Sequence, residues 1–383
     1  MKCKLSDICS FRKGKVEVEN LNAKNYISTE NMLPNKCGIT EASSLPTVSL
    51  TQEYKNGDVL VSNIRPYFKK IWQAQYDGGC SNDVLVFVPK PNMDKDFLYY
   101  VLADDDFFTY SMATSKGTKM PRGDKTSIMQ YEVPLIDLQV QKKIASVLKA
   151  LDEKIELNNE INNNLEEQLS ALFVNMFGHS IDSLDNSDIK LGDLIESVDN
   201  RGKTPPLSDE PTDYPIIDVR ALSGNSRIID YTNCTKYVSK ETYNNWFRSG
   251  HPKEYDILIS TVGSLAEMKI FLGTIGCIAQ NVVGFRTKGI SPLYLYQYLN
   301  YIKNDLVAYN IGSVQPSIKV THIIKHSIYI ASKEDIEIFD NIARNITKKI
   351  FANCQENEAL KQMRDTLLPK LMSGELDVSN IKI

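Results

Sequence analysis

The sequence predicts an α+β protein in which two mixed α/β domains are joined by two long α-helices forming an antiparallel coiled coil, with an internal pseudo-twofold repeat. Three observations support this fold class. Short stretches recur once along the 383-residue chain. Two of them have the seven-residue spacing of apolar residues that is typical of coiled coils. The segment before each of these is rich in short β-type runs. The predicted parts are domains at 1–137 and 188–331, helices at 138–177 and 332–373, a linker at 178–187 and a tail at 374–383.

The repeat is clearest in two pairs of short segments. Asp58–Ser62 (DVLVS) matches Asp256–Ser260 (DILIS), 198 positions later. Gly117–Pro121 (GTKMP) corresponds to Gly312–Pro316 (GSVQP), 195 positions later. A sequence that repeats itself in this way predicts two copies of one fold.

Both predicted long helices carry apolar residues at alternating steps of four and three, which is the pattern of a coiled-coil seam. Asparagines occupy two seam positions in each helix, Asn158 and Asn162 in the first, and Asn353 and Asn357 in the second, again 195 positions apart. Asparagine at a seam weakens a coiled coil but fixes its register. We interpret the four as spacer-register residues of a helix pair about 58 Å long that holds two domains at a set separation. Alternatively, they are tolerated polar residues in a loose hairpin.

The ends of the two helices carry matching signals. Asp137 and Ser332 stand where each helix should begin, and their side chains can accept hydrogen bonds from the first turn. Gly178 and Gly374 follow the predicted ends and act as stop signals. Pro369 should end or kink the second helix at the preceding residue.

The two domains read as short strands separated by turns and followed by short amphipathic helices. Glycine and asparagine interrupt runs rich in valine, isoleucine and tyrosine. The predicted strands are 59–62, 84–88, 257–260 and 282–285, and the predicted helices are 97–112 and 292–309.

Composition sets limits on function. The formal net charge of −4 argues mildly against a nucleic-acid partner, so any DNA site must come from local clusters. Seven scattered cysteines have neither zinc spacing nor a disulfide pattern, which indicates reduced thiols. No apolar run approaches membrane-spanning length, and residues 1–15 have no apolar core of the signal-peptide kind. We therefore expect a cytoplasmic protein without a membrane partner.

Basic residues gather in loops of both domains, whereas the first long helix is acidic. Lysine and arginine neutralise DNA phosphates, and arginine and glutamine can also bond base edges. Further arginines, Arg227 and Arg248, follow in the second domain. Alternatively, each cluster is only a solvated face. The candidate DNA-binding residues are Arg12, Lys13, Arg65, Lys69, Lys119 and Arg122 in the first domain, and Arg201, Lys203, Arg220 and Gln315 in the second.

The sequence offers no catalytic constellation. Arg201–Thr204 ends like a phosphate-binding loop, but Ser197 stands where that loop needs its first glycine. His322 and His326 lie in a stretch that reads as β-rich, which favours a structural pair. The run Asp104–Asp106 is interpreted as a helix-capping or surface cluster rather than a metal site. We therefore predict no catalytic residue and no metal ligand.

Several segments resemble one family. Residues 134–152 (PLIDLQVQKKIASVLKALD) resemble the central region of type I restriction-modification specificity subunits, the S subunits that recognise DNA sequence. Residues 364–375 (RDTLLPKLMSGE) resemble their distal region. Residues 57–62 and 255–260 are similar to the recurring strand of their target-recognition domains. The resemblance covers essentially the whole chain.

The resemblance implies a non-catalytic subunit whose two target-recognition domains each read one half of a split sequence in double-stranded DNA. The helix pair would space the halves and dock two methyltransferase (modification) subunits, and endonuclease (restriction) subunits would join the complex. S-adenosylmethionine, ATP and Mg²⁺ would belong to those partners, with no cofactor on this chain. Two rival hypotheses remain: a coiled-coil scaffold that binds only protein, and a metal-dependent nuclease using Asp104–Asp106.

Overall fold

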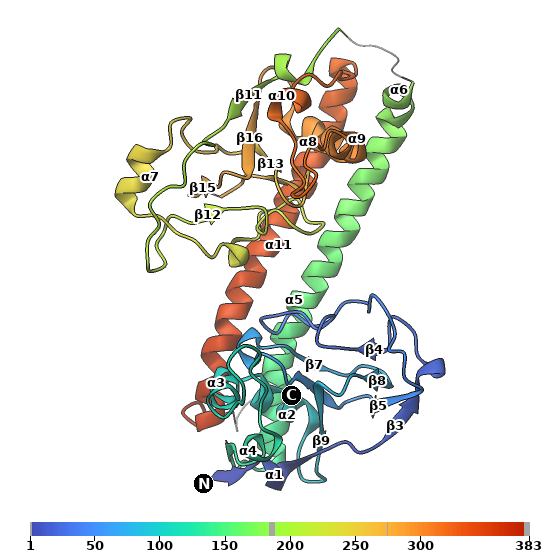
Figure 1. Cartoon of the computed structure of the whole chain (residues 1–383), viewed down its shortest axis with the longest axis vertical. Helices are drawn as coiled ribbons and strands as arrows, with labels where there is room; N and C mark the ends of the chain where they lie inside the picture. The colour runs from blue at the N-terminus through green and yellow to red at the C-terminus, as the bar shows by residue number, and fades with distance from the viewer. Residues whose placement is uncertain (1, 184–187, 274, 379–383) are drawn as a thin grey trace. The chain divides into compact units, whose positions relative to one another are not determined.

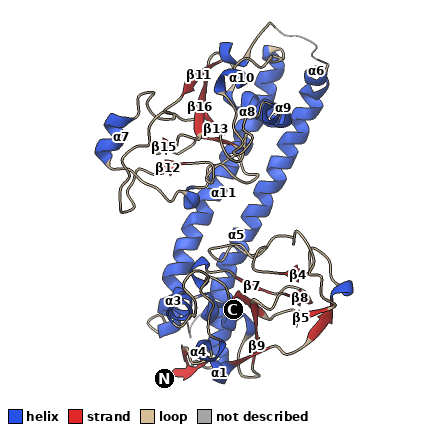
Figure 2. Cartoon of the chain, viewed as in Figure 1, coloured by secondary structure: helices blue, strands red, loops and turns tan. Residues whose placement is uncertain are grey.

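The computed structural model describes residues 2–183, 188–273 and 275–378. The chain divides into two compact units, residues 1–155 with 359–383 (unit 1) and residues 156–358 (unit 2). Two long helices, α5 (Leu138–Phe173) and α11 (Lys333–Ser373), contribute residues to both units. Figure 1 shows the course of the chain, and Figure 2 shows both helices as continuous elements.

Unit 1 is built around a four-stranded antiparallel sheet with strand order β2-β9-β6-β7. A second sheet has the order β3-β5-β8-β4, and β1 pairs with β10. The strands are β1 (Lys2–Lys4), β2 (Cys9–Phe11), β3 (Lys15–Glu17), β4 (Tyr26–Ile27), β5 (Leu50–Tyr54), β6 (Val59–Ser62), β7 (Ile71–Gln73), β8 (Gly78–Cys80), β9 (Val84–Pro89) and β10 (Glu132–Pro134). The shorter helices are α1 (Leu5–Ile8), α2 (Lys95–Ala103), α3 (Asp105–Ala113) and α4 (Lys125–Ile128).

Unit 2 contains the matching four-stranded antiparallel sheet, with strand order β11-β16-β13-β14, and α8 packs on it (Figure 1). A separate pair joins β12 to β15. The strands are β11 (Ile195–Val198), β12 (Ile216–Ile217), β13 (Ile257–Ser260), β14 (Met268–Ile270), β15 (Cys277–Ile278) and β16 (Val282–Thr287). The shorter helices are α6 (His179–Asp182), α7 (Lys240–Trp246), α8 (Pro292–Tyr301), α9 (Lys303–Ala308) and α10 (Val320–Ile323).

The two main sheets repeat each other in register as well as in strand order. Leu60 of β6 lies opposite Val86 of β9, and Leu258 of β13 lies opposite Gly284 of β16. Both members of the pair are displaced by the same 198 positions between the two sheets. The predicted repeat of an α+β fold is therefore confirmed, down to the pairing of individual residues.

The long helices begin where the sequence predicts. The Asp137 carboxylate accepts a hydrogen bond from the Gln139 amide at 2.8 Å, and the Ser332 hydroxyl accepts one from the Asp335 amide at 3.1 Å. These bonds satisfy amides that the first turn of a helix leaves without a partner.

One expectation about the helix ends is wrong, and one of the two outcomes expected of Pro369, an end to the helix, does not occur. Gly178 does not stop the first helix: its φ of −54° is helical, and the chain continues through a π-helical turn (Val174–Gly178) into α6. The predicted linker is thus partly helical, and its residues 184–187 lie outside the described residues. Pro369 does not end α11, which runs on to Ser373 and stops before Gly374, whose φ is +77°. Burial of Leu371 and Met372 in the unit 1 core stabilises the turn after the proline.

Each unit packs its segments of the long helices onto its own sheet domain. In unit 2, the ring of Phe173 from α5 lies 5.5 Å from Phe339 of α11 and 5.6 Å from Tyr294 of α8, centroid to centroid. In unit 1, Leu148 of α5 and Leu371 of α11 share a core with residues of α2. Burial of one such side chain contributes about 1.5–3 kcal/mol, so packing rather than helix propensity holds these helices in place. Among the described residues, no helix is both long and apolar enough to cross a membrane.

Candidate nucleic-acid interface

Three loops of unit 1 are held together at one end of the main sheet by main-chain hydrogen bonds. The loop after β6 begins at Asn63, whose amide donates to the carbonyl of Asp83 at 2.8 Å. The Gly123 amide donates to the Asn63 carbonyl at 3.1 Å, and the Arg65 amide donates to the Pro121 carbonyl at 2.8 Å. The loop at 63–70, the turn at 81–83 and the loop at 114–124 thus form one surface, which we call loop surface 1.

Unit 2 contains the same arrangement, here called loop surface 2. The Thr261 amide donates to the Asn281 carbonyl at 2.8 Å, the Ile318 amide to the Thr261 carbonyl at 2.8 Å, and the Gly263 amide to the Pro316 carbonyl at 3.0 Å. Each bond is the counterpart of one in unit 1, displaced by 198 positions after the strand and by 195 in the long loop. The two offsets seen in the sequence therefore mark two loops that meet in space.

A glycine lets the long loop turn tightly in each unit. Gly117 has a φ of +92°, a conformation that L-residues with a side chain rarely adopt. A Cβ atom on Gly312 would lie 1.9 Å from the carbonyl oxygen of Gln315. The paired motifs Gly117–Pro121 and Gly312–Pro316 are thus explained by the same close turn.

On loop surface 1, Arg65 and Lys119 are exposed, and neither side chain makes a hydrogen bond or ion pair with any described residue. Arg65 is held in a left-handed conformation with φ of 50°. Arg122 is also exposed and lies 3.2 Å from an Asp83 oxygen. Lys69 is partly exposed and its ammonium lies 2.8 Å from Asp105. Four predicted basic residues therefore share this surface or its border.

The other two basic residues predicted in the first domain lie elsewhere. Arg12 donates to a buried carboxylate, Asp58, with a 2.8 Å bond from Nη2 to Oδ1, and this hydrogen bonding raises the pKa of Arg12. Arg12 directly follows β2. In unit 2 the counterpart of Asp58, Asp256, binds an arginine from a different strand, Arg286 of β16, at 2.7 Å. Arg12 therefore holds the fold together and is not part of loop surface 1. Lys13 is exposed next to it.

A pair of loops that carry basic residues, here called the basic loop pair, adjoins loop surface 2. The Asn200 side chain donates to the Gly250 carbonyl at 2.9 Å and accepts from the Ser249 amide at 2.9 Å, which joins the loop at 199–204 to the segment around Arg248. Arg201, Lys203 and Arg248 are all exposed there. Arg201 also binds its neighbour Asp199, with Nε 2.8 Å from Oδ1.

The basic loop pair is connected to loop surface 2 through one turn. Gln280 donates to the Thr204 hydroxyl at 2.9 Å, and the next residue, Asn281, accepts from Thr261. The sequence does not predict that Arg248 lies beside the loop at 199–204, because the residues near Arg248 carry no signal for a contact with residues 47 positions earlier. Arg220 is exposed and paired with Asp218 at 2.7 Å.

Gln315 is exposed on the tight turn of loop surface 2, as expected. Its neighbour Val314 is 97% exposed, and sequence reasoning did not single it out. Val314 stands 195 positions after Lys119, so the equivalent place carries a cation in one unit and an apolar group in the other. The offset itself was the signal that could have identified Val314.

One expectation for the second domain is wrong. Arg227 is not part of a basic surface, because its side chain has no exposed area and binds Glu166 of α5. Its positive charge is neutralised inside unit 2 and is not available to a phosphate.

The four seam asparagines lie together in the helix pair of unit 2, and each is at most 5% exposed. The Asn158 side chain donates to Oδ1 of Asn357 at 2.9 Å, and the Asn353 side chain donates to Oδ1 of Asn162 at 2.8 Å. Partner numbers fall along one helix as they rise along the other, so the pairing is antiparallel. A shift of 195 positions converts one bond into the other, so the two bonds are equivalent in the repeat.

The residues considered for catalysis cap helices, form ion pairs or lie in secondary structure. Asp104 caps α3 by accepting from the Asp106 amide at 3.1 Å, and Asp105 pairs with Lys36 and Lys69. His322 lies in the short helix α10 rather than in a strand, which corrects the β-rich reading. Across residues 2–183, 188–273 and 275–378, no group of three or more histidines, cysteines or acids could hold a metal ion.

The buried cysteines are poor nucleophiles. Burial raises the pKa of Cys9, Cys80, Cys234 and Cys277 to about 12, so these thiols stay protonated at neutral pH. Their role in the described structure is to fill the cores of the two units.

Comparison with known proteins agrees with this architecture. The family model described as type I restriction modification DNA specificity domain matches residues 1–167 and again residues 184–361. The type I restriction enzyme HindI specificity subunit of Haemophilus influenzae is 24% identical over 92% of this chain and 94% of its own length. The MjaIX specificity subunit of Methanocaldococcus jannaschii is 25% identical over 77% of this chain and 72% of its own length.

Among solved structures, the type I restriction-modification S subunit from M. genitalium aligns over 97% of this chain and 96% of its own, with a TM-score of 0.55 and 17% sequence identity. At that identity the likeness concerns the fold. The two matches to the family model, one for each copy of the repeat, cover most of the sequence. The chain therefore belongs to the family of type I restriction-modification specificity subunits.

Proposed function

We propose that this chain reads a bipartite sequence in double-stranded DNA, with loop surface 1 contacting one half of the target and loop surface 2 the other. The observation that carries the proposal is the duplicated loop arrangement: equivalent main-chain bonds build loop surface 1, which exposes basic side chains, and loop surface 2, which exposes Gln315 and adjoins the basic loop pair. Membership of the family supports the same reading.

In this proposal the exposed cations set the position of the protein on the duplex, and a few side chains read base edges. Arg65, Lys119, Lys203 and Arg248 would contact phosphates or guanines, and Gln315 has the amide that can bond adenine on two atoms. Arg122, Lys69, Arg201 and Arg220 would have to exchange an intramolecular carboxylate for DNA.

A salt series tests the DNA-binding step. Neutralisation of phosphates releases counterions, so the affinity of the full-length chain for duplex DNA should fall steeply with salt. Lys119→Gln and Lys203→Gln should each reduce the slope of log affinity against log salt by about 1. Lys333→Gln is the matched control, because Lys333 is 93% exposed on α11, outside both loop surfaces. Affinity that does not depend on salt would favour a scaffold that binds only protein.

A genetic test addresses sequence reading directly. Deletion of the gene from its host should remove one split methylated motif from the genomic methylation map, and expression of the gene should restore it. An unchanged map would contradict the proposed function.

Two methyltransferase subunits are proposed to dock on the helix pair, and endonuclease subunits to join the complete complex. S-adenosylmethionine, ATP and Mg²⁺ are proposed to bind those partners and not this chain. Ile338 and Ile342, one turn apart on α11 and 49% and 41% exposed, are apolar surface that suits a docked protein. Substitution of both by glutamate should reduce co-purification of the methyltransferase subunit without loss of DNA affinity.

A further inference from the structure

Arg227 joins the sheet domain of unit 2 to the long helix α5. Its side chain has no exposed area. Its Nε lies 3.0 Å from each Glu166 carboxylate oxygen, its Nη2 lies 2.6 Å from Oε2, and its main-chain amide donates to Oε1 at 2.7 Å. Arginine binds a carboxylate in this forked way with defined direction, which a lysine ammonium cannot reproduce.

The same guanidinium reaches two further helices. Its Nη1 donates to the Thr347 hydroxyl of α11 at 3.0 Å, and its Nη2 lies 3.5 Å from Oε1 of Gln297 in α8. Its carbon stands 5.4 Å from the ring centroid of Tyr296. One side chain of the sheet domain is therefore held by both long helices at once. We call Arg227, Glu166 and Thr347 the latch.

The loop that carries the latch is itself fixed. Lys269 of β14 is 1% exposed and donates to the carbonyl of Gly224 at 2.6 Å and to that of Ser226. The Ile270 amide donates to the Arg227 carbonyl at 2.8 Å, which ties the loop to the edge of the main sheet. Hydrogen bonds thus run without interruption from the long helices through Arg227 and its loop to the sheet of unit 2.

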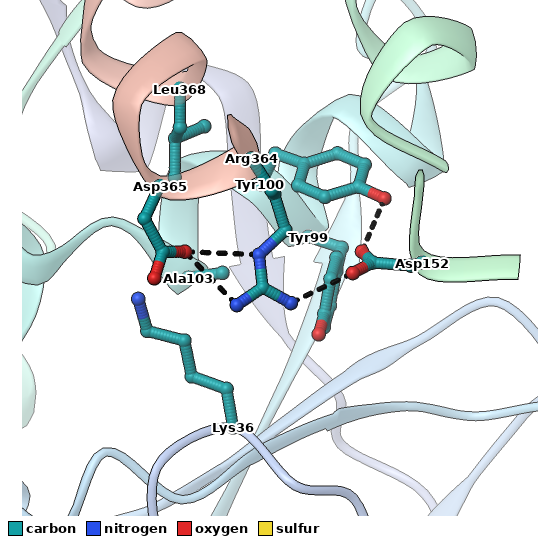
Figure 3. A pocket seen from close by; sticks show the side chains of 8 residues that line it. All are labelled: Lys36, Tyr99, Tyr100, Ala103, Asp152, Arg364, Asp365 and Leu368. Atoms are coloured by element: carbon teal, nitrogen blue, oxygen red, sulfur yellow. Dashed lines mark hydrogen bonds and ion pairs between the residues drawn. The ribbon is translucent and has the colours of Figure 1, made fainter. Parts of the chain in front are cut away.

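Unit 1 uses a different arrangement at the equivalent place. Asp152, which stands 195 positions before Thr347, is bound by Arg364 of α11 at 2.8 Å and by Tyr100 of α2 at 2.7 Å (Figure 3). Here the arginine comes from the long helix, and Arg364 also binds Asp365 beside it. At this place in unit 1 the ion pair thus joins the two long helices to each other, whereas the latch joins both long helices to the sheet domain of unit 2.

We propose that Arg227 is a positioning residue for spacer length: through the latch it fixes the second recognition domain on the helices, so that only DNA with the correct interval between half-sites is accepted. The inference rests on the proposed function. One added base pair shifts a half-site by about 3.4 Å and rotates it by about 35°. A domain held by a buried, forked ion pair cannot follow such a shift, because displacement would leave a buried charge without its partner.

The test compares the methylated motif of the wild type with that of latch variants, each expressed as the full chain with its methyltransferase partner in a host that lacks the motif. Arg227→Lys and Glu166→Gln keep the size of the side chain and remove the forked ion pair. We expect the same half-site sequences to be methylated, and sites with one base pair more or fewer in the spacer to become substrates. The preference for the cognate spacer should fall about tenfold or more, the scale of one mismatched base pair.

Arg286→Lys is the matched control. Arg286 pairs with Asp256 at 2.7 Å in the same unit, and its hydrogen bonds go to Asp256 and to the His251 carbonyl rather than to the long helices. Arg286→Lys should lower the melting temperature of the protein about as much as the latch variants do, and it should retain the spacer preference of the wild type. Thr347→Val removes a single bond of the latch and serves as the deciding variant if the charge variants do not fold.

Folded latch variants with wild-type spacer selectivity would overturn the inference, and so would equal relaxation of the spacer by Arg286→Lys. A wild-type gene that adds no methylated motif would instead contradict the proposed function.

Discussion

Substitution of the paired seam asparagines can distinguish two hypotheses: that they fix the register of the helix pair, or that they are tolerated polar residues. Asn158→Leu removes the side-chain donor that bonds Asn357 Oδ1 at 2.9 Å and Glu356 Oε2 at 2.8 Å. It leaves Oδ1 of the buried Asn357 facing an alkyl group, while the Asn357 side-chain nitrogen still donates to Asn159 Oδ1 at 2.9 Å. A buried polar group that loses its partner destabilises a protein by about 1–3 kcal/mol, so we expect about 2 kcal/mol from this change.

The double variant gives the sharper expectation. Replacement of both partners by apolar groups of similar shape is close to neutral or stabilising. Asn158→Leu with Asn357→Leu should therefore lie within about 1 kcal/mol of the wild type, although each single change costs about 2 kcal/mol. The coupling energy of this cycle would then be about 3 kcal/mol, the upper end for residues in contact. The pseudo-twofold pair, Asn353 with Asn162, should give the same coupling.

Stability is measured by urea denaturation followed by circular dichroism. Because a chain with two units need not unfold in one step, hydrogen exchange of amides in α5 and α11 localises the effect. Asn163→Leu is the control, since Asn163 is exposed on the next turn of α5 and should change stability by less than about 0.5 kcal/mol. The double variant should also relax the DNA spacer while its half-site sequences stay the same. Single effects that simply add in the double variant would refute the reasoning.

Three further outcomes are expected. Burial lowers the pKa of Lys269 from 10.5 to about 8, so between pH 8 and pH 10 the unfolded chain binds more protons than the folded chain. The free energy of unfolding, measured by urea titration, should therefore rise over this pH range in the wild type. The rise should be smaller in Lys269→Met. Asp256→Asn breaks the pair with Arg286 and should destabilise unit 2 by about 3 kcal/mol in the same assay, with Asp58→Asn matching it in unit 1. Gly312→Ala places a Cβ 1.9 Å from a carbonyl oxygen and should weaken DNA binding in the salt series with little change in melting temperature; unchanged affinity would contradict the role of this turn.

Local patterns in the sequence predicted much of the fold. The strands Val59–Ser62 and Ile257–Ser260 were expected at those residues, because a short apolar run between turns determines a strand without distant information. The repeat then supplied long-range information, since matching offsets imply matching contacts. Asp137 and Ser332 were found in the same way, because capping depends on residues within one turn.

What sequence reasoning missed depends on residues far apart in the chain. Arg227 reads as a surface cation, and only folding brings Glu166 to it from 61 positions away. Gly178 has the composition of a stop, yet packing of Phe177 and Ile181 in the core of unit 2 continues the helix past it. The predicted helix at 97–112 is divided into α2 and α3 by Asp104, whose ψ of 140° is incompatible with a continuous helix.

The main-chain bonds that join the loops of each loop surface have a consequence for how the side chains on these loops can change. The bonds from Asn63 to Asp83 and from Thr261 to Asn281 use amides and carbonyls, which every residue other than proline supplies. Side chains on the loop tips, such as Lys119 and Val314, therefore contribute little to folding. Mutation can exchange them at little cost to the scaffold, so under the proposed function a lineage can acquire a new target without a new fold.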